Sequence, residues 1–159
     1  MNINGWDYNF KSLPYWDNRE KFPYVYDLLF ENEQADIAFL IYSITEVTMC
    51  YYVGFLAIFK NKEKPELLLN ATKGGFLNEK VIFSIENRFA FVKSAIYIKK
   101  GWPIFIFDLL NRQFACLKII PNSKNDLMGR INETKIEIDK LKWMPFERLD
   151  SFCSELRDK

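Results

Sequence analysis

The sequence predicts a mainly β fold, an antiparallel meander sheet with an irregular N-terminal arm and a C-terminal amphipathic helix. The stretch from Val81 to Ile120 holds four apolar runs, rich in β-branched and aromatic side chains and separated by short polar breaks. Aromatic residues form 17% of the chain, which also favours β-structure. Near the C-terminus, apolar residues recur at spacings of three and four, the period of a helix with one buried face.

One domain is expected, because 159 residues can bury a single core without disulfide or metal staples. Composition divides this domain into four parts. They are an aromatic acidic arm (1–34), a β-meander core (35–120), a polar loop (121–130), and a strand followed by the C-terminal helix (131–159).

A reducing, cytoplasmic location is expected. The three cysteines are far apart, have apolar neighbours and form no CxxC pair, at Cys50, Cys116 and Cys153. The first residues show no basic region followed by an apolar one, so no secretory signal is expected. The apolar stretches are broken before the roughly 20 residues that span a bilayer, so no membrane partner is expected.

The arm is expected to be largely irregular, and the first half of the core is expected to consist of strands. Residues 1–23 contain scattered prolines and are expected to be irregular, and 24–33 fits either a strand or a short helix. Residues 35–44 and 49–59 are predicted strands. Gly54, within the second of them, predicts a bulge or a close approach of another backbone. A return strand begins at Leu67, and the segment TKGG at 72–75 predicts a tight turn.

Four strands follow in the central stretch, at 81–85, 89–98, 104–107 and 114–120. Pro103 lacks an N–H group, so we expect it at the start of a strand or on a sheet edge.

The part of the chain after the core is predicted to be a loop followed by a strand and a helix. Polar residues at 121–129 predict the loop, and alternation at 131–143 predicts a strand with one exposed face. Pro145 suits the first turn of a helix. Five apolar residues should share one side of this helix, namely Phe146, Leu149, Phe152, Cys153 and Leu156.

A weak internal repeat supports a consecutive meander. The segment VGFLAIFKNKEKPELLLN matches VKSAIYIKKGWPIFIFD after one gap, which aligns Val53 with Val92 and Pro65 with Pro103. The two copies would resemble propeller blades, although a closed propeller needs at least four. Similar hairpin composition could produce the same match and is the favoured explanation.

Catalytic and metal chemistry find little support in the sequence. The chain has no histidine, which excludes the usual Ser/His/Asp and Cys/His systems and the HExxH zinc site. The candidate carboxylates, Glu46, Glu86, Asp108 and Asp126, occur at turns or strand ends and show no sign of convergence. No calcium loop, cysteine ligand set or phosphate-binding glycine motif is present. We therefore predict no enzyme, catalytic residue, metal, cofactor or small-molecule substrate.

The arm is the predicted partner-binding surface. Residues 1–36 carry seven acids and three bases, whereas residues 60–130 carry six acids and thirteen bases. Rings supply contact area and carboxylates steer a basic protein. The candidate contacts are Trp6, Asp7, Tyr8, Tyr15, Trp16, Asp17, Tyr24 and Asp27. The alternative is that Trp6 and Trp16 only attach the arm to the sheet.

A basic, aromatic patch is the second candidate surface. It would make the chain a scaffold module or one that binds single-stranded nucleic acid through phosphate contacts and stacking. The patch consists of Lys60, Lys62, Lys64, Lys99, Lys100 and Trp102. The simpler interpretation is that lysines at strand edges prevent aggregation between sheets. The net charge of +1 favours this interpretation and makes nucleic acid the less favoured partner.

In overall character, with WDYNF, PYWDN and the β-rich centre as its local features, the chain resembles the immunity proteins of bacterial polymorphic toxin and contact-dependent inhibition systems. The resemblance implies a non-enzymatic protein that binds and neutralises one cognate toxin. Many such toxins are basic, so an acidic, aromatic surface would suit them. No motif carries specific site residues across.

Overall fold

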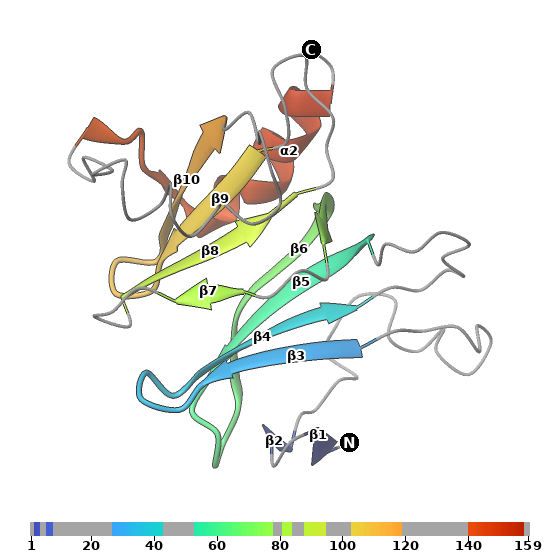
Figure 1. The fold of residues 1–159 in the computed structure, drawn as a ribbon, viewed down its shortest axis with the longest axis vertical. Helices are drawn as coiled ribbons and strands as arrows, with labels where there is room; N and C mark the ends of the chain where they lie inside the picture. Colours follow the sequence, from blue (N-terminus) through green and yellow to red (C-terminus); the bar gives the residue numbers. More distant parts are fainter. Residues whose placement is uncertain are drawn as a thin grey trace.

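In the computed structural model, the chain forms two antiparallel sheets that pack with a short C-terminal helix (Figure 1). The mainly β, antiparallel fold class predicted from the sequence is confirmed. The residues that the structure describes are 2–3, 6–7, 27–42, 53–77, 81–83, 88–94, 103–118 and 140–157.

The first sheet is a consecutive meander in the order β3-β4-β5-β6. Its strands are β3 (Asp27–Asn32), β4 (Ile37–Tyr42), β5 (Val53–Lys60) and β6 (Glu66–Leu77). The segment that the sequence left open between strand and helix is therefore a strand. It forms one edge of the first sheet, as part of the region expected to be arm.

The long strand β6 corrects two predictions, the tight turn at TKGG and the strand that carries the bulge. The TKGG segment does not reverse the chain, because Gly54 pairs with Phe76 on one side of it and Leu56 pairs with Ala71 on the other. A single residue, Phe55, thus stands opposite Thr72–Gly75, so β6 bulges and then rejoins the ladder. The glycines supply backbone freedom, and the continuing strand β5 turns that freedom into a bulge. The register does shift beside Gly54, but the extra residues belong to β6, so the bulge predicted within the strand at 49–59 lies on the neighbouring strand.

The second sheet has the order β11-β10-β9-β8-β7. Its strands are β7 (Ile82–Phe83), β8 (Phe89–Lys93), β9 (Pro103–Asp108), β10 (Gln113–Lys118) and the short β11 (Met144–Pro145). As expected, Pro103 begins its strand. The second half of the strand predicted at 89–98 and nearly all of the segment predicted as loop and strand at 121–143 lie outside the described residues.

One hydrophobic cluster joins the inner faces of both sheets and the helix. Alternate residues point into it, such as Ile37, Phe39 and Ile41 of β4 and Phe105 and Phe107 of β9. The Phe39 and Phe107 rings meet edge to face across the two sheets, with centroids 5.8 Å apart. Burial of these faces drives the two meanders together.

The C-terminal helix is confirmed, with a different start. Pro145 lies in β11 and precedes a 3₁₀ turn, η5 (Phe146–Arg148), which continues into α2 (Leu149–Arg157). Its predicted apolar side faces the shared core. Phe146, Leu149, Cys153 and Leu156 are buried there, and Phe152 packs against them partly exposed.

The outer faces of the sheets are also covered. The first sheet is covered by Trp6, from the two-stranded unit of β1 (Asn2–Ile3) and β2 (Trp6–Asp7), which packs with Ala38, Leu40, Ala57 and Phe59. On the second sheet, Leu141 and Trp143 pack against Phe89, Phe91, Ile104 and Ile106. The Trp143 ring stacks on Phe89 with centroids 5.9 Å apart.

The residues matched in the internal repeat lie in two different sheets, and only the prolines occupy similar places in them. Pro65 immediately precedes β6, and Pro103 begins β9. Val53 starts β5, and Val92 lies within β8. Each unit contains two consecutive antiparallel strands, β5 with β6 and β8 with β9, and duplication stays a prediction.

Candidate protein-binding surface

The turn between β3 and β4 is built by its polar side chains. Asn32 Oδ1 accepts hydrogen bonds from the backbone N–H groups of Gln34 and Ala35, at 3.1 and 3.2 Å. These bonds take the place of hydrogen bonds to a neighbouring strand and favour a turn. Asp36 then adopts a left-handed conformation, φ 52°, that Asp tolerates better than most residues. Glu33 and Gln34 are consequently held out into solvent.

The turn between β5 and β6 is bonded to this first turn. The Asn61 N–H donates to the Asp36 carbonyl oxygen at 3.0 Å, and the Lys62 N–H donates to Asp36 Oδ1 at 2.8 Å. Asn61 itself has φ 65°, and its side-chain oxygen accepts the Lys64 N–H at 3.3 Å. Two turns that lie 25 residues apart in sequence, Asp36 to Asn61, therefore form one continuous surface.

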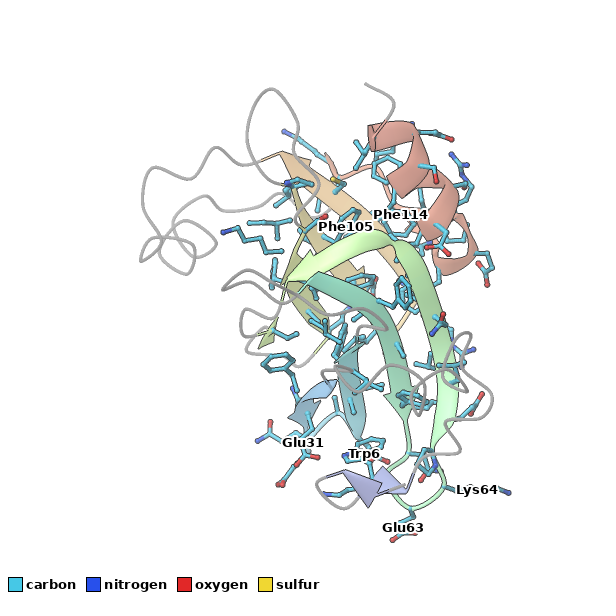
Figure 2. All side chains as sticks on the ribbon, turned by 90° about the vertical axis from the view of Figure 1, so that its right-hand side faces the viewer. Trp6, Glu31, Glu63, Lys64, Phe105 and Phe114 are labelled. Atoms are coloured by element: carbon cyan, nitrogen blue, oxygen red, sulfur yellow. The ribbon has the colours of Figure 1, made fainter. Side chains whose placement is uncertain are left out.

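We call residues 31–36 and 60–66 the acidic turn surface. It contains five acids and three lysines, so its formal charge is 3 − 5 = −2. Two of the lysines are ion-paired: Lys60 Nζ lies 3.3 Å from Glu66 and Lys62 Nζ lies 3.6 Å from Glu31. Figure 2 shows Glu63 and Lys64 at the outer end of this surface. The excess negative charge is carried by exposed Glu33, Asp36 and Glu63.

Trp6 attaches the N-terminal strands to the first sheet. Its side chain is 1% exposed, and its Nε1–H donates to Glu31 Oε2 at 2.5 Å. The same oxygen faces Lys62, so the indole, the carboxylate and the ammonium form one chain of polar contacts. The sequence placed Trp6 among the candidate partner contacts, but its side chain is buried. This position agrees with the alternative interpretation, in which Trp6 attaches the arm to the sheet.

The other arm residues are only partly described. The backbones of Asp7 and Asp27 lie in β2 and β3. Asp27 stands at the end of β3 opposite the acidic turn surface. Tyr8, Tyr15, Trp16, Asp17 and Tyr24 lie outside the described residues. The described acidic surface is therefore formed by two turns, and none of the arm residues predicted to contact a partner lies in these turns.

The proposed basic patch is much less positive than its sequence suggests. Lys60 and Lys62 each face a carboxylate, and Lys64 is exposed beside Glu63 in the same turn. The remaining members of the patch, Lys99, Lys100 and Trp102, lie outside the described residues. On the described side, the nearby carboxylates remove the excess positive charge that phosphate binding needs.

A second polar cluster lies at the end of β9, where the sequence noted Asp108 only as a possible catalytic carboxylate. Asp108 is 2% exposed and accepts two hydrogen bonds from Arg88, at 3.2 and 3.0 Å. It also accepts the N–H groups of Leu110 and Asn111 and the Asn111 side-chain amide. These five bonds occupy the carboxylate and hold the β9–β10 turn.

The pKa of Asp108 reflects these contacts. Burial alone would raise the pKa, but the Arg88 hydrogen bonds, the N–H groups of Asn111 and Leu110, and the Arg88 charge outweigh burial and lower it from 3.8. The carboxylate is ionised and fully engaged. The contacts of this carboxylate hold the turn, and the sequence signal that could have indicated this role is the pair of turn-forming residues Asp108 and Asn111.

No protein-family model matches the sequence, no curated protein is detectably similar to it, and no solved structure matches its fold. Within the described residues, no three His, Cys, Asp or Glu side chains converge to hold a metal ion. Among those residues no helix is long and apolar enough to cross a membrane.

Proposed function

We propose that this protein is a non-enzymatic binding protein of the immunity type, which neutralises a cognate basic toxin domain in the bacterial cytoplasm. The resemblance in overall character supports this class. The observation that carries the proposal is the acidic turn surface, in which two turns joined at Asp36 present an excess of carboxylates.

Its geometry suits recognition of a basic protein. Hydrogen bonds through Asp36 hold both turns, so little conformational entropy is lost when a partner binds. Exposed Glu33 and Glu63 extend from the two turns. Their field accelerates encounter with a positively charged surface, and the effect weakens with salt.

The test uses the toxin domain encoded by the gene adjoining this one. Co-expression should restore growth to cells that produce the toxin, and the purified proteins should form a one-to-one complex. The double variant Glu33→Lys/Glu63→Lys should associate at least about tenfold more slowly at low salt. Stopped-flow fluorescence measures this rate across a salt series.

The matched control is Glu147→Lys, compared with each single substitution. Glu147 is exposed in η5, beside the second sheet, and its replacement changes the net charge by the same amount. Its association rate should equal that of the wild type. Equal rates for Glu33→Lys and Glu147→Lys would exclude the acidic turn surface, whereas an adjoining metabolic gene, or a toxin left active, would exclude the immunity function.

A further inference from the structure

The turn between β9 and β10 has the same construction as the turn between β3 and β4. In each, the last residue of the first strand accepts two backbone N–H groups, and four loop residues separate the strands. The fourth loop residue has φ 52° in both, Asp36 in one turn and Arg112 in the other. Both turns extend to the left in Figure 1. Residues at equivalent positions of the two turns can therefore be compared directly.

The comparison singles out Leu110. At the position two residues after the accepting side chain, the first turn exposes Gln34 and the second exposes Leu110. The turn geometry therefore does not require leucine. Leu110 is 71% exposed and is the one large hydrophobic residue exposed within the described part of the chain. The second turn thus presents an apolar side chain to water where its counterpart in the first turn presents a polar one.

Arg112 is a second departure from what the turn favours. Glycine and asparagine adopt positive φ at lower cost than arginine. Asp36, its counterpart, uses its carboxylate to bond the neighbouring turn. Arg112 is exposed, and none of the described residues forms an ion pair with its guanidinium. Its charge is thus available beside Leu110.

The backbone that carries these two side chains is held from both flanks. The Leu109 N–H donates to the Arg88 carbonyl at 2.9 Å, and the Phe146 N–H donates to the Arg112 carbonyl at 3.2 Å. Asp108 holds the centre of the turn through its bonds to Leu110 and Asn111. An apolar anchor on a rigid turn loses little entropy on binding.

We propose that the Leu110 tip, residues 110–112, docks into a partner protein that offers an apolar pocket with a carboxylate at its rim. Leu110 fills the pocket, and Arg112 pairs with the carboxylate. This contact is separate from the acidic turn surface and does not depend on it.

Charge and size select this occupant over others. Two copies meeting tip to tip would place one Arg112 against the other, which opposes a symmetric dimer. One leucine and one arginine are also too small a surface to anchor a membrane. A pocket on a protein matches both side chains.

The experiment places a photo-crosslinking benzoyl-phenylalanine at position 110, or at position 34 as the matched control, in the full-length protein inside its native cells. Position 110 should give one dominant protein adduct that position 34 does not give. The crosslinked partner, identified by mass spectrometry and purified, is then titrated with variants. Leu110→Gln, which copies the first turn, should weaken binding at least tenfold, and Gln34→Leu should not change it.

The role of Arg112 has its own readout. Arg112→Asn should weaken binding while raising the melting temperature, because asparagine tolerates the left-handed conformation. Arg112→Glu should weaken binding further, through repulsion by the rim carboxylate. The proposal is overturned by equal crosslinking at positions 110 and 34, by an adduct only with lipid or a second copy of the chain, or by unchanged affinity of Leu110→Gln.

Discussion

Asp108 carries the most concentrated polar network among the described residues. Its carboxylate joins β8 to β9 through Arg88 and at the same time forms the turn that follows. Arg88 also lies over the Phe89 ring, 4.9 Å from its centroid, so its charge is stabilised from two sides. The equivalent residue in the first sheet, Asn32, forms its turn without a charge. The charge at position 108 is thus separable from turn formation.

The variant Asp108→Asn tests this separation. Its amide oxygen can still accept the turn N–H groups, but the ion pair is lost, so we expect about 1–3 kcal/mol less stability at pH 7. The lowered folded pKa means that the ionic contribution is complete above the unfolded value near 3.8 and disappears as pH falls through the folded value. Urea unfolding of both proteins between about pH 7 and 2 should show the gap closing below about pH 4. A gap that persists unchanged at the lowest pH would contradict this account.

The unit of β1 and β2 is held by one side chain. These strands have two residues each, too few to be stable alone, and Trp6 supplies their attachment to the outer face of β4 and β5. The indole contributes apolar contact with Leu40 and Phe59 and a hydrogen bond to Glu31. Because Glu31 also faces Lys62, the attachment reaches the acidic turn surface.

Replacing Trp6 with Phe should keep most of the apolar contact and remove the bond to Glu31. We expect a loss of about 1.5–3 kcal/mol of stability, the usual range for a hydrogen bond to a charged group. Equilibrium urea unfolding measures it. Glu33→Gln, an exposed change in the same turn region, should stay within about 0.5 kcal/mol of the wild type. A neutral Trp6→Phe would show that the ring contact alone attaches the N-terminal strands.

The two sheets depend on each other because their inner faces form one hydrophobic cluster. Phe107 shows this dependence, since its ring contacts Phe39 of the first sheet and Phe146 of the helical end, at 5.8 and 6.0 Å between centroids. The helix α2 extends the cluster with Leu149, Cys153 and Leu156. Neither sheet can expose its inner face without exposing that of the other.

The two sheets are therefore expected to unfold as one cooperative unit. Phe107→Leu should reduce stability by about 1–3 kcal/mol. Native-state hydrogen exchange should then show the same loss of protection in β4 as in β9, although β4 belongs to the other sheet. Leu117→Ala, on the outer face of the second sheet, is the comparison. Protection lost in β9 alone would mean that the sheets open independently.

Local patterns predicted much of the fold. The apolar runs became β4, β5, β8, β9 and β10, and the spacing of three and four at the C-terminus became η5 and α2 with its expected buried side. Pro103 began a strand because a residue without an N–H group is unsuited to the interior of a ladder. These features depend on residue chemistry within a few positions, which a sequence displays directly.

Long-range contacts decided the rest. TKGG became a bulge because β5 continued beside it, and Trp6 became an anchor because Glu31, 25 residues away, accepts its N–H group. The lysines of the β5–β6 turn lost their excess charge to Glu31 and Glu66. The acidic turn surface exists only because Asp36 and Asn61 meet in space. By itself the sequence determined most strands of the two sheets and the C-terminal helix, since propensity and periodicity are local. The tertiary structure decided which charges neutralise one another and which side chains remain exposed, since both depend on distances between residues far apart in the chain.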